Sequence, residues 1–95
     1  MSTRETLSRP YARAAFELAR AAGAVADWSQ KLAFASAVAA DPQASALISS
    51  PRIAPEQLTT LFLPQGEASD SAFALFIAQL TGNRRIGLLP EIAAQ

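Results

Sequence analysis

The side chains that carry acid–base, nucleophilic and metal chemistry are sparse in this sequence. It has no His and no Cys, and its eight Asp and Glu residues are scattered singly. Without an imidazole or a thiol, Ser-His-Asp catalysis, thiolate nucleophiles and His or Cys metal ligands are excluded. The glycines form no phosphate-binding loop, because no Lys-Ser or Lys-Thr pair follows Gly82 or Gly87. We therefore expect no catalytic residue, no cofactor, no metal ligand and no enzymatic activity.

The charge balance of the chain also argues against binding to nucleic acids and to anionic membranes. The eight Lys and Arg residues balance the eight Asp and Glu residues, so the net charge is zero. A neutral chain without a basic stripe is a poor binder of phosphate backbones. Arg84 and Arg85 form a basic doublet, which we interpret as carbonyl capping and dipole compensation at the end of a helix. We expect no nucleic-acid partner.

Residues 9–19, RPYARAAFELA, indicate the helix around which the chain is organised. The pattern predicts a helix over 6–22, with Ser8 as the N-cap, Pro10 in the first turn and Gly23 as the C′ residue. Its charged residues gather in one narrow arc, and the apolar arc spans about 220°, about twice the width that one core contact needs. Such a helix is either the centre of a bundle or part of a groove for a partner's helix, lined by Ala14 with Tyr11 and Leu18.

Apolar periodicity and helix stop signals predict five further helices. The second covers 24–40 and ends at Asp41-Pro42, which caps a short third helix over 43–49. The others cover 56–63, a stretch capped by Ser69 or Asp70 and ending at Thr81, and 91–95. The residues expected to face the core are Val25, Trp28, Leu32, Phe34, Ala35, Val38, Ala39, Leu47, Ile48, Leu58, Leu61 and Phe62.

The fifth expected helix carries no charged side chain between Ser71 and Asn83. Phe73, Phe76, Ile77 and Leu80 form a core stripe, and Leu75 lies about 160° from its centre. A solvated helix face usually carries charges. This helix is therefore either fully buried or half covered by a partner, and the small size of the bundle favours the partner.

The fold expected from these patterns is all-α, a compact six-helix bundle whose last helix is truncated. Ninety-five residues allow one domain, 1–95. No apolar run is long enough for a transmembrane helix and no signal peptide opens the chain, so we expect it to be soluble.

Four segments together resemble the δ subunit of F-type ATP synthases, the family of the mitochondrial oligomycin-sensitivity-conferral protein. They are residues 9–19, WSQKLAFA at 28–35, APEQL at 54–58 and NRRIGLLP at 83–90, the last similar to the N-x-R-L-x-x-L-P turn of the family. The resemblance covers all 95 residues, in order. It implies that the chain is the N-terminal helical domain alone, without the C-terminal domain that binds the b subunits of the peripheral stalk.

The resemblance also implies a function. The domain would hold the N-terminal helix of an α subunit in a groove between helices one and five, as a non-catalytic stator component that resists rotation during proton-driven ATP synthesis. It would lie peripherally at the cytoplasmic face of the bacterial inner membrane, without inserting into it, and would be a monomer in isolation. Carried over residue by residue, the groove would be lined by Tyr11, Ala14, Ala15, Leu18, Ala22, Ala72, Leu75, Phe76 and Gln79. The alternative is a free-standing helical adaptor in which the same face closes a homodimer.

Overall fold

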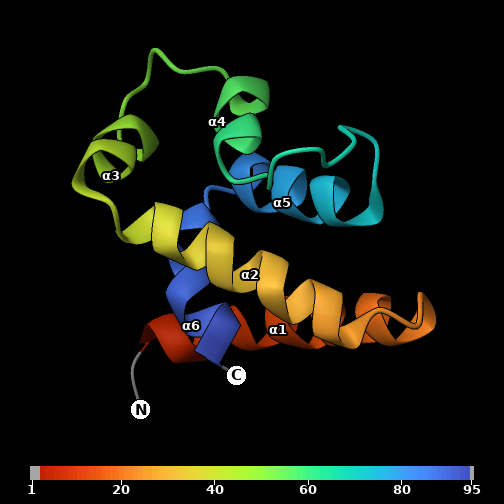
Figure 1. Ribbon diagram of the computed structural model, residues 1–95. Helices are drawn as coiled ribbons and strands as arrows, with labels where there is room; N and C mark the ends of the chain where they lie inside the picture. Colours follow the sequence, from red (N-terminus) through yellow and green to blue (C-terminus); the bar gives the residue numbers. More distant parts are fainter. Residues whose placement is uncertain (1–2, 95) are drawn as a thin grey trace.

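The structure, a computed structural model, describes residues 3–94 and is all-α, as predicted (Figure 1). No strand occurs within this range. Its elements are α1 (Thr3–Ala21), α2 (Val25–Ala40), α3 (Pro42–Ile48), α4 (Pro55–Leu61), α5 (Ala72–Gly82), the 3-10 helix η1 (Ile86–Leu88) and α6 (Leu89–Ala94).

α1 and α2 form an antiparallel hairpin, which runs along one side of the molecule (Figure 1). The turn lies at Gly23, whose φ of +65° is the left-handed conformation that glycine adopts without strain. The Gly23 amide donates to the Arg20 carbonyl at 3.0 Å and the Ala24 amide donates to the Ala19 carbonyl at 2.9 Å. These two bonds form a Schellman motif, and the predicted end of the helix at Gly23 is confirmed.

The start of α1 differs from the sequence prediction. The helix is already formed at Thr3, so Pro10 lies inside it rather than in its first turn. Ser8 is not an N-cap: it is buried, and its hydroxyl donates to the Glu5 carbonyl at 2.9 Å. The hydroxyl therefore bonds to a carbonyl one turn earlier in the helix. An N-cap serine would instead accept a hydrogen bond from an amide in the turn that follows it.

α3 begins as predicted. The Asp41 carboxylate accepts from the amides of Gln43 at 2.8 Å and Ala44 at 3.4 Å, with Pro42 at the first helical position. Side-chain capping of this kind satisfies amides that have no partner inside the helix.

α5 begins later than expected, and its cap is Ser71 rather than Ser69 or Asp70. The Ser71 hydroxyl accepts from the Ala74 amide at 3.0 Å. At the other end, Arg84 takes the left-handed position, with φ of 58°. The Arg84 amide donates to the Thr81 carbonyl at 3.1 Å and the Arg85 amide to the Leu80 carbonyl at 2.7 Å, a second Schellman motif. The arginine doublet thus follows the end of a helix, as predicted.

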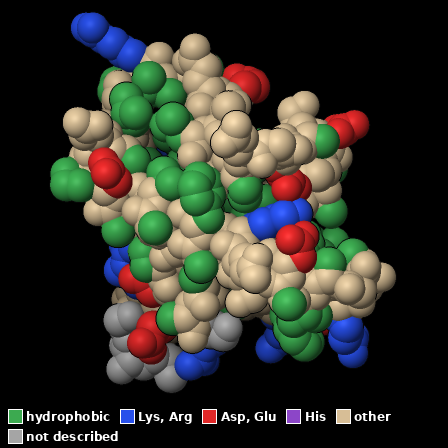
Figure 2. All heavy atoms as spheres, viewed as in Figure 1, with side chains coloured by type: hydrophobic (Ala, Val, Ile, Leu, Met, Phe, Trp, Pro, Cys, Tyr) green, Lys and Arg blue, Asp and Glu red, His purple; other side chains and the backbone are tan. Residues whose placement is uncertain are grey.

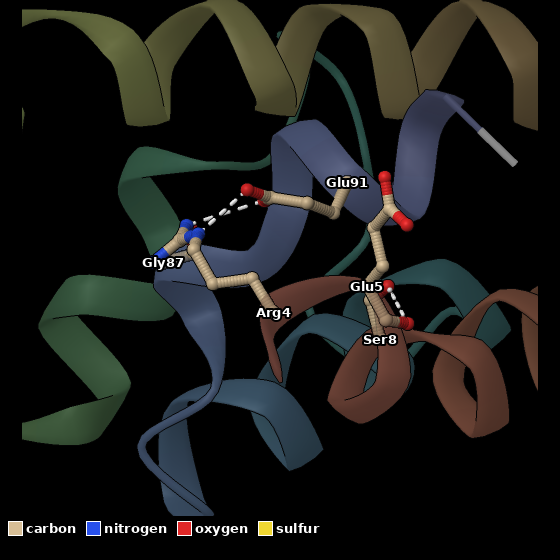
Figure 3. A network of polar contacts seen from close by, with 5 residues as sticks. All are labelled: Arg4, Glu5, Ser8, Gly87 and Glu91. Carbon is tan, nitrogen blue, oxygen red and sulfur yellow. Dashed lines mark hydrogen bonds and ion pairs between the residues drawn. The ribbon is translucent and has the colours of Figure 1, made fainter. Parts of the chain in front are cut away.

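α6 lies against both α1 and α2. It begins at Leu89 rather than at Glu91, and Gln95 lies outside the described residues. Arg4 ties it to the first turns of α1 (Figure 3). The Arg4 Nε atom donates to a Glu91 carboxylate oxygen at 2.6 Å, and Nη2 contacts the other oxygen and the Gly87 carbonyl. This hydrogen-bonded ion pair lowers the pKa of the Glu91 carboxyl and raises that of Arg4.

The core lies between the α1–α2–α6 group and the α4–α5 pair. Its largest fully buried apolar side chains are Phe62, Phe73, Ile77, Leu80, Leu89 and Ile92. Ser8 is polar and is also fully buried. Three side chains expected in the core are exposed instead, namely Val25, Phe34 and Leu61. The radius of gyration, 12.4 Å, matches the value of about 12 Å for a compact domain of this length. None of the helices over residues 3–94 is long and apolar enough to span a membrane.

Candidate functional site

α5 has one face in the core and one face that is open and uncharged. Phe73, Phe76, Ile77 and Leu80 are buried, as the periodicity predicted. Leu75 is 60% exposed, and its open neighbours on the helix are Ala72, Ala78 and Gln79. α5 is therefore not fully buried, and its open face offers apolar area with one amide and no charge.

α1 contributes a second open apolar surface, because its buried stripe is narrow. The stripe consists of Ser8, Ala15 and Ala19. On one flank of it Leu18 is 42% exposed, and Ala14 and Ala22 are open beside it. Small residues next to a leucine let the backbone of an incoming helix approach closely.

Trp28 of α2 links α1 with α5. Its ring packs edge-on against Phe73 at 5.3 Å and Phe76 at 5.8 Å between centroids. On its other side it lines a depression together with Ala15 and Ala19. A polar contact reinforces the link, since the Asn83 side-chain amide donates to the Tyr11 hydroxyl at 3.4 Å.

The structure divides the nine predicted partner-binding residues into two groups. Ala15 and Phe76 are buried in the same core cluster, and Tyr11, half-buried, packs against that cluster. These three residues hold α1 and α5 in place. The six that remain open to solvent are Ala14, Leu18, Ala22, Ala72, Leu75 and Gln79.

The N-terminus of α5 is fixed to α2 by a charged cluster. The Lys31 ammonium lies 2.9 Å from Glu67 and 3.0 Å from Asp27, and 5.8 Å from the centre of the Phe73 ring. The Ser71 cap also donates its hydroxyl proton to the Glu67 carboxylate. The hydrogen bonds from Ser71 and then from Lys31 lower the pKa of the Glu67 carboxyl. The cluster raises the pKa of Lys31, chiefly through Glu67.

Sequence reasoning did not find the roles of Asn83 and Glu67. Asn83 appeared only as part of a turn, and Glu67 lies in an irregular segment without periodicity. The sequence carries no recognisable signal for Glu67, because it lies four residues before the Ser71 cap and outside α5. Nothing in the sequence pairs Asn83 with Tyr11, because 72 residues separate them.

The arrangement supports non-covalent binding of an apolar partner. Within residues 3–94 no group of three acidic side chains lies close enough to hold a metal ion. What the open faces of α1 and α5 offer is apolar area, small residues and one amide, which are the features of a surface that takes up a helix.

Comparison with known proteins agrees with the segments noted in the sequence. The family described as ATP synthase delta (OSCP) subunit matches residues 7–95. The ATP synthase subunit delta of Xanthomonas campestris pv. campestris strain B100 is 45% identical over 93 residues, which is 98% of this chain and 52% of that protein. The corresponding protein of Xanthomonas oryzae pv. oryzae strain PXO99A is 44% identical over the same coverage. The chain spans about half the length of these relatives, and with a family match over nearly all of its residues it belongs to the ATP synthase delta (OSCP) subunit family.

Proposed function

We propose that this chain is a non-catalytic part of the stator of an F-type ATP synthase, corresponding to the N-terminal domain of the delta subunit. Its partner is the N-terminal helix of one α subunit, which lies in a groove between α1 and α5. The observation that carries the proposal is the pair of open, uncharged faces on these helices, with Leu18 42% and Leu75 60% exposed. Family membership supplies the complex in which the partner is found.

The chemistry of the two faces suits helix-in-groove recognition. The alanines on both helices allow a close approach, Leu18 and Leu75 supply apolar area, and Gln79 offers an amide at the edge. An interface of about 1,200–1,600 Å² with such a face can support nanomolar affinity, although area alone does not fix affinity. Slow dissociation is the property that a stator contact needs, because torque acts on it continuously during rotation.

In the full complex the domain would sit on the catalytic head, peripheral to the membrane at its cytoplasmic face. The half of the relatives that this chain does not match would supply the contact with the b subunits. Proton-driven ATP synthesis depends on this connection, since an untethered head would turn with the central shaft. The domain itself handles no proton and no nucleotide.

Co-sedimentation with the catalytic head of the enzyme tests the proposal. The isolated chain should sediment with a purified head that contains intact α subunits, and should remain free when the α N-terminal segments have been removed. Binding that survives this removal would contradict the proposal. Self-association of the chain in place of binding would favour the homodimeric adaptor, which would use the same apolar face.

A further inference from the structure

The open apolar stripe of α1 extends beyond the residues predicted to bind the partner. Five residues follow one another at spacings of four, three, four and four, which places them on one face of the helix. They are Leu7, Tyr11, Ala14, Leu18 and Ala22. Leu7 is 39% exposed, close to the 42% of Leu18. The stripe therefore has an open leucine near each end, and the proposed groove uses only one of them.

This stripe lies away from the charges of α1. At 100° per residue, its centre is about 145° from an arc of four charged side chains, Arg9, Arg13, Glu17 and Arg20. The next position of the stripe toward the N-terminus is Arg4, whose guanidinium is held in the ion pair with Glu91. The uncharged surface of α1 therefore begins at Leu7, and it offers a partner the same kind of face there as around Leu18 (Figure 2 shows such hydrophobic side chains among the charged ones on the surface).

α5 runs beside α1 in the opposite direction and covers only part of its length (Figure 1). The end of α5 is level with Tyr11, whose hydroxyl accepts from the side chain of Asn83 directly after the helix. The first half of α5 faces the later turns of α1, because Phe73 packs against Trp28, and Trp28 lines a depression together with Ala19. Contacts near both ends of α5 thus fix its register along α1.

The two walls of the groove consequently differ in reach. At 1.5 Å per residue, the 11 residues of α5 extend about 16 Å, and the stripe from Leu7 to Ala22 extends about 22 Å. Leu7 lies about 6 Å before Tyr11 along the helix axis, and so beyond the end of α5. A partner helix that follows the whole stripe reaches one turn further along α1 than along α5.

We propose that the N-terminal helix of the α subunit continues past the end of α5 and places an apolar side chain against Leu7, which is a further anchor of the contact. The proposal rests on the proposed α1–α5 groove and specifies the partner there as a helix of at least four turns with one uncharged face. Continuity carries it, since Leu7 and Leu18 share one uncharged stripe. Large apolar side chains left open along one strip are typical of association surfaces.

Titration calorimetry with a synthetic α-subunit N-terminal peptide compares Leu7 with two matched positions on the same helix. Leu7→Ala and Leu18→Ala should each weaken the peptide about fivefold or more, because each removes apolar contact with it. Phe16→Ala removes a side chain that is 56% exposed on the other flank of α1, and should leave the affinity within about twofold. Alanine favours helix, so the three variants should remain folded in thermal melts.

Peptide variants separate a direct contact at Leu7 from a change in the domain. One version replaces the apolar residues in the first turn of the peptide's helix by alanine, and a second replaces those in the last turn. One of the two should bind the parent chain about fivefold more weakly and lose its sensitivity to Leu7→Ala, while it stays sensitive to Leu18→Ala. The other should stay sensitive to Leu7→Ala.

The outcomes distinguish this inference from the proposed groove. Normal affinity of Leu7→Ala beside weakened binding of Leu18→Ala would overturn the inference and leave the groove in place. An equal loss from Leu7→Ala with all three peptides, or an equal loss from Phe16→Ala, would show an indirect effect and would also overturn it. No peptide binding at tens of micromolar would contradict the groove itself, and the inference with it.

Discussion

At the scale of single residues, neighbours on α1 have opposite surroundings. Ala14 is open to solvent and Ala15 is 3% exposed in the core. We predict that Ala14→Glu leaves the domain folded, with a melting temperature within a few degrees of the parent. The same substitution should weaken the α-subunit N-terminal peptide at least a hundredfold, because it places an unpaired charge against the apolar face of that helix. Titration calorimetry and a thermal melt on one sample measure both quantities.

Ala15→Glu is the matched control. It buries a charge without a partner and should cost more than about 4 kcal/mol, enough to unfold much of the protein. Leu75→Asp on the open face of α5 should behave like Ala14→Glu. A folded Ala14→Glu or Leu75→Asp variant with normal peptide affinity would show that the α-subunit helix binds elsewhere.

Arg84 carries a backbone strain that a single substitution can relieve. Its φ of 58° places a residue with a Cβ at the C′ position of α5, which costs about 1–2 kcal/mol relative to glycine. A glycine at this position removes the strain but raises the conformational entropy of the unfolded chain, which offsets part of the stabilisation. We predict that Arg84→Gly stabilises the domain by about 0.5–1 kcal/mol, a rise of several degrees in melting temperature.

Arg85→Gly is the control for this prediction. Arg85 has φ of −113°, where glycine brings no relief, so that variant should be neutral or less stable than the parent. If Arg85→Gly raised the melting temperature as much as Arg84→Gly, the left-handed conformation would not be the source of the gain.

At the scale of elements, α5 shows what the sequence specifies well. Its four buried large side chains recur at helical spacing, so the core face and the open position of Leu75 both follow from periodicity. The helix boundaries at Gly23 and at Asp41-Pro42 were predicted equally well. Gly23 adopts the left-handed conformation that ends a helix, and Asp41 with Pro42 caps the start of one.

Other elements lay beyond sequence reasoning. α2 has more apolar positions than its single contact face can bury, and the sequence does not say that Trp28 and Ala35 are buried while Phe34 and Val25 stay open. Leu61 is exposed for the same reason, because Leu58 of α4 and Phe62, directly after the helix, are the residues buried in the core. The start of α1 was missed because proline inside a helix is rare enough to suggest a boundary. For the predicted site, the sequence pattern identifies the two helices and their open residues. It does not show that Ala15 and Phe76 are buried, because their burial depends on how the whole domain packs.

The attachment of α5 to α2 predicts acid sensitivity. The pKa of Glu67 is lowered in the folded state by Ser71 and Lys31, so the unfolded chain binds more protons in acid and stability falls as the pH drops through this window. The stabilisation is fully present above the unfolded pKa of about 4.3 and is lost as the pH falls through the lower folded pKa. Glu91, paired with Arg4, contributes in the same direction.

Glu67→Gln should therefore flatten the acid limb of stability against pH, and should cost about 1 kcal/mol at pH 7 through its weakened hydrogen bonds. Urea unfolding between pH 3 and pH 7 measures both effects. Glu56→Gln, on the exposed first turn of α4, should leave the shape of the curve unchanged. A parallel loss in the two variants would show that net charge, rather than the α2–α5 cluster, governs the acid response.

At the scale of the whole molecule, the 95-residue chain should fold alone and remain a monomer. Its core includes Phe62, Phe73, Ile77, Leu80, Leu89 and Ile92 from several helices in one cluster. Far-UV circular dichroism should show a helical spectrum with a cooperative melt, and sedimentation at tens of micromolar should give a mass of about 10.0 kDa. A dimer mass would favour the adaptor function, and a non-cooperative melt would mean that this core does not sustain a folded domain.

The most direct test of the α1–α5 groove is an NMR titration of the isotope-labelled chain with a synthetic α-subunit N-terminal peptide. The chain's small size, 10.0 kDa, suits residue-by-residue mapping of the bound surface. We predict one-to-one binding, with the largest amide shift changes around Ala14, Leu18, Leu75 and Gln79 and small changes around Phe16 and Val25. No binding at tens of micromolar, or shift changes centred on Phe16 and Val25 instead, would contradict the proposed groove.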